Sequence, residues 1–384
     1  MRSDTHRLLS TPTATALYMG AVLGAGALVL PGVAYREAGP ASLLAWLLDA
    51  GVGIALALMF ARLATAYPGA RGLAGFVQEG LGRSWSRVAG WSYFIAAATG
   101  QVVVAMSGAL YAGRAAGLGE GPTLVLAEAV LAVAVALNLW GLRPAGIVQI
   151  ALMAVAALVL AGTAAAGLRH ARPTRLEPFI PHGWQGVDHA AVTLFFAFAG
   201  WEAIASLSGL FADRAHGVAR ATTVALTAIT TLYLALGCAV VLGLASRAAS
   251  GPTALETLWR MQAGKAAVAV GAATAVCLAL GTANAFVAGA SRLGDRLLFA
   301  ARPETAVPRL TTALIGGYAA VGVVAVVRLA GGSLAIPLLI ASTLTLVAYV
   351  LCALSGLRVL PGRQRWMPLT VVLVAVLLLA AGVA

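Results

Sequence analysis

The sequence predicts an all-α protein that crosses a membrane with about eleven helices. Of its 384 residues, 61% are hydrophobic and 10% are charged, and the mean hydropathy is +0.94. A soluble fold has too little interior to bury so much apolar surface. The basic residues lie in short segments between apolar runs, where they orient membrane helices, so the net charge of +12 does not indicate a nucleic-acid partner. The expected surroundings are therefore a lipid bilayer.

The apolar runs define the predicted spans, because about 18 apolar residues are enough to cross the hydrocarbon core as a helix. The eleven spans are 12–35, 41–66, 86–113, 121–141, 144–168, 189–211, 219–245, 264–290, 310–329, 333–358 and 366–384. If the N-terminus is cytoplasmic, 16 of the 25 basic residues fall on the cytoplasmic side, in agreement with the positive-inside rule. We therefore expect a multi-pass protein of the cytoplasmic (inner) membrane with its N-terminus in the cytoplasm.

The spans form a single transmembrane domain built from two repeats. Spans one to five (12–168) and spans six to ten (189–358) contain five helices each, and an odd number of helices inverts the second unit relative to the first. Span eleven (366–384) lies outside the repeat and is expected to be peripheral. The connections 67–87 and 291–309 mix apolar and charged residues, as helices at the membrane interface do.

Glycine interrupts two spans at matching places in the two repeats. Gly24, Ala25 and Gly26 interrupt span one, and Ala199 and Gly200 interrupt span six. Glycine weakens a helix by roughly 1 kcal/mol relative to alanine, and in hydrocarbon the freed backbone groups need a protein or substrate partner. At the first break, the N–H groups of the second half-helix can bind a carboxylate. Close helix packing is the alternative for one break, but the recurrence favours a binding site near the bilayer midplane.

Three acids lie within the predicted spans, where a carboxylate costs several kcal/mol unless it is paired, hydrated or protonated. For Glu202, directly after Trp201 in span six, two interpretations stay open: proton coupling, and a protonated side chain that caps free N–H groups of the broken helix. Asp49 in span two is either a second coupling site or the polar lining of a water-filled path. Glu128 lies near the end of span four and can reach the interface.

The remaining polar residues inside spans give weaker signals. Those of span eight can line an ion site or pack across helices, and packing is favoured. Those of spans three and ten are candidates for lining a pathway, although hydroxyls in membrane helices usually bond their own backbone. These residues are Thr282 and Asn284 in span eight, Tyr93 and Gln101 in span three, and Ser342, Thr343 and Thr345 in span ten.

No catalytic residue, metal site or cofactor is expected. Cys238, Cys277 and Cys352 lie singly in apolar segments, and no histidine is paired with a cysteine or a carboxylate at ligand spacing. The sequence also lacks a glycine-lysine phosphate loop. A membrane-embedded enzyme would need paired reactive groups on facing helices, and a channel would need charged rings or a repeated filter motif. Both classes are therefore lesser alternatives to a carrier.

Four short motifs follow one another along the first eight spans. They are GAVLGAGALVLP at 20–31, YPGARGLAGFVQEGLG at 67–82, FAGWE at 198–202, and Ser291-Arg292 followed by Pro303 and Pro308. In this order and spacing they resemble an amino acid permease of the amino acid-polyamine-organocation superfamily, over roughly residues 12–358. Among its subgroups, the chain looks most like bacterial exporters of neutral amino acids such as methionine and the branched-chain set.

The resemblance assigns roles to the two breaks. It implies that backbone N–H groups of span one bind the substrate carboxylate and that carbonyls of the broken spans receive the amine. The residues carried over are Gly24, Ala25 and Gly26 for the carboxylate, and Phe198, Ala199 and Gly200 for the amine. It also implies an aromatic gate at Trp201 or Phe198, and it matches Glu202 to an acid that many members carry.

The function expected from this resemblance is secondary active transport of small neutral amino acids by alternating access. The substrates would be methionine, leucine, isoleucine or valine, and the mode would be proton-coupled efflux or antiport. Uptake by the same fold stays open as an alternative. Span five (144–168) contains no lysine, whereas some proton-coupled members of the superfamily carry one there, so coupling through a lysine is not expected.

Overall fold

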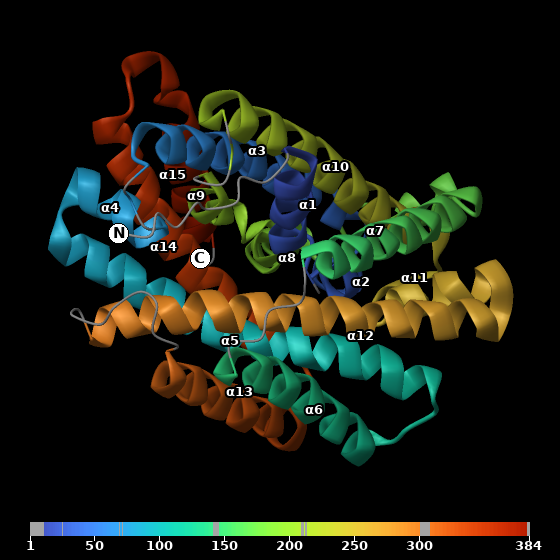
Figure 1. Cartoon of the computed structure of the whole chain (residues 1–384). Helices are drawn as coiled ribbons and strands as arrows, with labels where there is room; N and C mark the ends of the chain where they lie inside the picture. Colours follow the sequence, from blue (N-terminus) through green and yellow to red (C-terminus); the bar gives the residue numbers. More distant parts are fainter. Residues whose placement is uncertain are drawn as a thin grey trace.

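A computed structural model describes residues 11–24, 26–68, 70, 72–140, 146–208, 211, 213–299 and 308–381. The chain forms an all-α bundle of long apolar helices (Figure 1). Eight helical segments of the described chain are long and apolar enough to cross a membrane. With the two interrupted spans and the short last helix, they account for the eleven predicted spans. The predicted fold class is therefore confirmed.

The first half of the chain contains span one in two pieces, a short helix after span two, and four long helices. These elements are α1 (Thr11–Val22), α2 (Gly26–Ala38), α3 (Ser42–Ala66), α4 (Leu73–Leu81), α5 (Arg83–Ala115), α6 (Glu120–Leu139) and α7 (Gly146–Arg169). The second predicted span corresponds to α3, and α4 is the separate helix that the mixed composition of 67–87 predicts.

The second half begins with span six, which is divided into short pieces. These are α8 (Gly183–Leu194), the 3-10 turns η3 (Phe195–Phe198) and η4 (Trp201–Ala203), and α9 (Ile204–Leu207). The helices that follow are α10 (Arg214–Gly243), α11 (Ser246–Ala249), α12 (Ala254–Leu298), α13 (Arg309–Ala330), α14 (Ala335–Val359) and α15 (Trp366–Ala381).

Helix α12 differs from the predicted span eight at both ends. It begins ten residues earlier, at Ala254, and is kinked at Ala263 and Gly264, where Gly264 has φ 59. Glycine adopts this left-handed conformation without the steric cost of a Cβ atom. At the other end, α12 continues to Leu298. The prediction of a separate interfacial helix within 291–309 is therefore wrong for 291–298, because these residues extend the membrane helix.

Helices α5 and α12 pack along each other through the middle of the molecule, with α6 and α13 together on one side (Figure 1). The broken spans lie on the other side, where α2 packs against α8 and α1 packs against α10. Helix α15 packs on α14 and α3 at the periphery. The core that surrounds the two breaks is thus built from helices of both halves of the chain.

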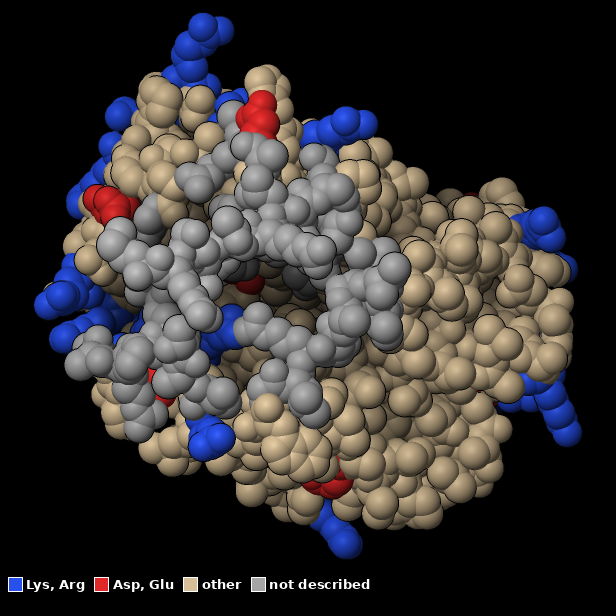
Figure 2. Space-filling model, viewed as in Figure 1, with Lys and Arg blue, Asp and Glu red and all other residues tan. Residues whose placement is uncertain are grey.

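The outer surface is largely apolar. Large side chains such as Val321 on α13 and Leu158 on α7 are exposed, as expected of helices that face lipid. Figure 2 shows more basic side chains at the left end of the molecule, around α4, than at the right end. This asymmetry is of the kind that the positive-inside rule describes.

Candidate substrate and coupling site

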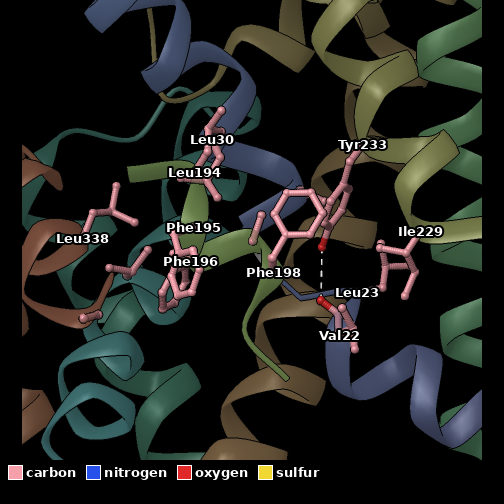
Figure 3. Packing of buried hydrophobic residues seen from close by; sticks show 14 of the residues in the cluster. Val22, Leu23, Leu30, Leu194, Phe195, Phe196, Phe198, Ile229, Tyr233 and Leu338 are labelled. Atoms are coloured by element: carbon pink, nitrogen blue, oxygen red, sulfur yellow. Dashed lines mark hydrogen bonds between the residues drawn. The ribbon is translucent and has the colours of Figure 1, made fainter. Parts of the chain in front are cut away.

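The break in span one is bridged by a tyrosine from another helix. Helix α1 ends at Val22 and α2 begins at Gly26; Gly24 is described between them, whereas Ala25 lies outside the described residues. The hydroxyl of Tyr233 on α10 donates to the Val22 carbonyl at 3.1 Å (Figure 3). The same carbonyl accepts from the Gly24 N–H at 2.8 Å. The carbonyl at the end of α1 is therefore satisfied by two neutral donors, as burial in an apolar bundle requires.

The two glycines of the first break face different neighbours. A Cβ atom at Gly24 would lie 3.2 Å from Cγ2 of Thr282 on α12, and one at Gly26 would lie 3.5 Å from Cα of Ala197 in η3. The small size of Gly26 thus lets the backbones of the two breaks approach each other. The methyl group of Thr282 therefore packs against the backbone of the first break.

The break in span six lies at the predicted residues. After η3, Ala199 is extended (φ −73, ψ 147) and Gly200 has φ 112 and ψ −12. A residue with a Cβ atom rarely adopts such a positive φ, so glycine at position 200 makes this turn possible. The chain then resumes with η4 and α9. Both helix interruptions expected from the glycine pattern are therefore present.

Glu202 caps the second break together with two tyrosines. The N–H of Gly200 donates to Oε2 of Glu202 at 3.1 Å and to the Tyr349 hydroxyl at 3.0 Å. The hydroxyls of Tyr349 on α14 and Tyr93 on α5 donate to the two carboxylate oxygens of Glu202. The capping interpretation of Glu202 thus has direct geometric support, and the same bonds connect the break to two long helices. Proton coupling through Glu202 stays a prediction.

The two candidates for an aromatic gate pack in opposite directions. Phe198 is fully buried, with its ring 5.6 Å from that of Tyr233 and 6.4 Å from that of Trp46. Trp201 is also fully buried, lies 5.7 Å from the ring of Tyr18, and accepts a 3.0 Å hydrogen bond from the Tyr18 hydroxyl at its carbonyl. Each aromatic residue is therefore held by another helix in this conformation.

Phe196 lies between the breaks, although the sequence did not single it out. Cβ atoms at Gly100 on α5 and Gly26 on α2 would lie 3.1 Å and 3.8 Å from its ring. Phe195, Phe196 and Phe198 project from the same short segment in Figure 3. The signal that could have identified Phe196 is its place in a run of aromatics directly before a glycine break.

Asp49 is completely buried on α3, and neither of its carboxylate oxygens has a hydrogen-bond partner among the described residues. Trp46, three residues earlier, contacts the Phe198 ring. Gly53, four residues later, is so close to Phe198 that an added Cβ atom would lie 2.5 Å from its Cδ1. Because residues at these spacings share one helix face, Asp49 lies on the face of α3 that flanks the second break.

The remaining polar residues that the sequence marked as candidates differ in their hydrogen bonding and burial. Asn284 accepts a 2.8 Å bond from Asn138 on α6, as expected of a packing group, and Thr345 donates to the Ala341 carbonyl of its own helix. Gln101 is fully buried with an unpaired side-chain amide in the described structure. Glu128 is half-buried.

In the part of the chain that is described, no group of three His, Cys, Asp or Glu side chains could hold a metal ion.

Comparison with known proteins identifies the family. A sequence model of the amino acid permeases matches residues 9–300. The chain belongs to this family. It is 29% identical to the amino acid permease YecA of Bacillus subtilis over 76% of this chain and 69% of the relative. It is 26% identical to the branched-chain amino acid permease BcaP of Bacillus subtilis over 57% of this chain and 51% of that protein.

The fold of this permease is that of a solved transporter. The crystal structure of MhsT in complex with L-phenylalanine matches with a TM-score of 0.68 at 14% identity, covering 98% of this chain and 99% of that chain. At this identity the match shows the fold alone. The relatives are transporters rather than enzymes. The resemblance to the superfamily is thus confirmed, and the permease is a multi-pass membrane protein of amino acid transport.

Proposed function

We propose that this permease carries small neutral amino acids, of the methionine, leucine, isoleucine and valine class, across the cytoplasmic membrane by alternating access. The observation that carries the proposal is the contact of the two helix breaks, where Gly26 meets Ala197. Backbone dipoles at two adjacent breaks replace the water around a zwitterion without a fixed charge. This chemistry suits a neutral amino acid better than a cationic one.

We assign the substrate carboxylate to the N–H groups at Gly24, Ala25 and Gly26, since α2 begins there and the N-terminus of a helix attracts anions. The amine is assigned to the carbonyls at Phe198, Ala199 and Gly200.

The walls of this site favour an apolar substrate side chain. The Phe196 ring stands against Gly26 and Gly100, and Phe286 on α12 also approaches Gly100, at 3.5 Å from an added Cβ atom. Aromatic rings and glycine backbone offer apolar surface and room but no charge. The relatives include a branched-chain amino acid permease and, at the same 26% identity, a cationic amino acid transporter of Mus musculus, so the uncharged lining of the site carries the choice between the two classes. We therefore place neutral aliphatic substrates ahead of cationic ones.

The proposal of alternating access rests on an inverted repeat with spans 12–168 and 189–358. The packing partners correspond between the two units: α1 packs on α10 and α7, while α8, its counterpart in the second unit, packs on α3 and α14. A two-fold relation between five-helix units produces such reciprocal pairs, and transport follows from the movement of one part against the other. Helix α15 takes no part in this correspondence.

For energy coupling we propose protons, with Glu202 as the carrier of the proton and Asp49 as a second candidate. Glu202 binds the Gly200 N–H of the break and receives hydroxyls from α5 and α14. A change in its protonation would alter these bonds and so the position of the break relative to both helices. We favour efflux or antiport, with the N-terminus in the cytoplasm, and uptake is the alternative direction.

The test is flux of radiolabelled methionine and leucine in proteoliposomes, with and without an imposed pH gradient. We expect saturable, gradient-driven flux in the wild type. Glu202→Gln should lose gradient-driven flux and keep exchange, whereas the matched control Glu177→Gln, in an exposed loop, should keep both.

Three outcomes would count against parts of the proposal. Unchanged gradient-driven flux in Glu202→Gln would reduce Glu202 to a structural cap. Competition by arginine or polyamines as strong as that by leucine would overturn the neutral substrate class. The absence of flux of any neutral amino acid in the wild type would overturn the substrate assignment altogether.

A further inference from the structure

A basic cavity lies at one end of the bundle, away from the two breaks. It has a volume of about 390 Å³ and is formed by α4, the beginning of α5 and the end of α12, which meet at the same end of the molecule (Figure 1). Its charged lining consists of Arg83 and Arg87 from α5, Arg296 from α12, and Glu79 from α4. Among the described lining residues, Arg296 makes an interaction of its own, so Arg83 and Arg87 carry the attraction of the cavity for an anion.

The walls of this cavity are held in place by bonds between helices. Ser86, in the first turn of α5, donates to the Ala74 carbonyl of α4 at 2.7 Å. Ser355 of α14 donates to the Phe76 carbonyl of α4 at 2.6 Å. A Cβ atom at Gly90 would lie 3.0 Å from Cδ2 of Leu297, so α5 and α12 also pack closely beside the cavity. The arginines are therefore presented by a preformed wall rather than by a loose loop.

An apolar stripe starts beside the arginines. Trp85, Val88 and Trp91 on α5 are 53%, 45% and 37% exposed, and their spacing of three residues places them along one side of the helix. Leu298 at the end of α12 is 44% exposed. Tryptophan concentrates at the level of lipid headgroups. Arg87 of the cavity lining lies one helical turn before Trp91 on the same side of α5, so an anionic head in the cavity can continue into apolar chains at Trp91.

We propose that this cavity binds the phosphate headgroup of an anionic phospholipid, with the acyl chains lying along Trp91 and Val88. Guanidinium groups bind phosphate oxygens through paired, charge-assisted hydrogen bonds. Arg83 and Arg87 supply these groups from the first turns of α5, where the positive end of the helix dipole adds to their charge. Basic pockets between membrane helices bind lipid headgroups in this way.

The test is native mass spectrometry of the full chain in a nonionic detergent, titrated with phosphatidylglycerol or phosphatidylcholine of identical acyl chains. We expect the wild type to retain phosphatidylglycerol in preference to phosphatidylcholine. Each arginine near an anionic lipid is worth about a fivefold change in affinity, so Arg83→Gln/Arg87→Gln should bind phosphatidylglycerol about twentyfold more weakly. The control Arg62→Gln/Arg363→Gln removes two exposed arginines elsewhere and should bind within about twofold of the wild type.

A second variant keeps the test decisive if the double substitution disturbs folding. Gln78→Glu adds a negative charge to the cavity lining at an exposed position, and it should weaken phosphatidylglycerol binding about fivefold. Equal retention of the two lipids by the wild type, or equal binding by Gln78→Glu and the wild type, would overturn the proposal. Binding of inorganic phosphate without preference for phosphatidylglycerol would overturn the lipid assignment in favour of a free anion.

Discussion

The breaks in span one and span six both free backbone groups inside the same bundle, but different chemistry holds those groups. In span one, the Val22 carbonyl accepts from Tyr233, a neutral hydroxyl at 3.1 Å. In span six, the Gly200 N–H donates to Glu202 at 3.1 Å, and this carboxylate also receives two tyrosine hydroxyls. Only the second arrangement contains a carboxylate. Protonation of this carboxylate would weaken the hydrogen bonds that it accepts.

We infer from this difference that the first break binds substrate and the second break responds to protonation. A neutral partner makes the first break insensitive to pH, which suits a site that must bind a zwitterion in both orientations of the transporter. A carboxylate that links the second break to α5 and α14 makes that break responsive to protonation. The predictions that follow test whether the two breaks are close-packed and whether their responses to pH can be separated.

The largest effect is expected from filling the contact between the breaks. In Gly26→Val, the new Cβ atom would lie 3.1 Å from Leu30 Cδ1 and 3.5 Å from Ala197 Cα, and overpacking of this kind costs about 1–3 kcal/mol. We expect methionine exchange in proteoliposomes to fall about a hundredfold, as the upper end of that range implies.

Gly289→Val is the matched control for this substitution, because a Cβ atom at Gly289 on α12 meets nothing within 4 Å. It should exchange methionine at close to the wild-type rate. Both proteins should elute as monodisperse peaks in size-exclusion chromatography. Normal exchange by a well-folded Gly26→Val would show that the site does not need the two breaks in contact.

The second-largest effect is expected from Tyr349→Phe, the first of two equivalent tyrosine substitutions that compare the pH responses of the two breaks. Tyr349→Phe removes a hydroxyl that binds both Glu202 and the Gly200 N–H. A hydrogen bond to a charged group is worth about 1.5–3 kcal/mol. We expect a roughly tenfold loss of exchange, at the lower end of that range. The pH profile of exchange should move to higher pH, because a carboxylate that loses a hydrogen-bond donor is protonated more readily. Exchange measured as a function of pH on both sides of the vesicle provides the test.

Tyr233→Phe removes the equivalent hydroxyl from the first break, where the partner is the neutral Val22 carbonyl. A neutral bond is worth about 1 kcal/mol, so KM should rise about fivefold. The pH profile should stay in place, because the contact contains no group that titrates near neutral pH. If both tyrosine variants shifted the profile equally, the proposed division between the breaks would fail.

The positions of the breaks were predictable from the sequence, whereas their partners were not. Glycine in an apolar run is a local signal, so Gly24, Gly26 and Gly200 could be identified without a structure. Tyr18 and Tyr233 contact breaks that lie 183 and 211 residues away in the chain. Nothing in the local sequence distinguishes such a tyrosine from any other aromatic residue in a membrane helix.

The dependence on packing between distant segments also explains the wrong prediction for residues 291–298 of α12. Residues 291–298 carry charges that resemble those of an interfacial helix, but in the fold they continue α12 beyond the predicted span. That Thr282 packs against the first break could not be predicted either, because its neighbour Gly24 is 258 positions earlier in the sequence. The periodicity of hydrophobic residues determines helices well, but which helix faces which break depends on packing across both repeats.

A smaller effect is expected for Asp49, which flanks the second break but bonds to neither break in the described structure. Asp49→Asn keeps the shape and disturbs no hydrogen bond, so thermal stability should not fall. As the second buried acid able to hold a proton, its loss should lower gradient-driven flux about threefold, less than in Glu202→Gln. Flux equal to the wild type would leave Asp49 as a polar lining group. A complete loss would move the coupling site from span six to α3.

The smallest effect is expected at Thr282, whose methyl group faces Gly24 and whose hydroxyl is buried without a partner in the described residues. Valine has nearly the same shape, and removal of an unpaired buried hydroxyl is neutral or stabilising by about 1 kcal/mol. Thr282→Val should therefore exchange methionine within about twofold of the wild type at every pH tested. A large loss would mean that the hydroxyl binds a substrate group or an ion during transport. The first break would then not be served by backbone groups and Tyr233 alone, and its contrast with the second break would weaken.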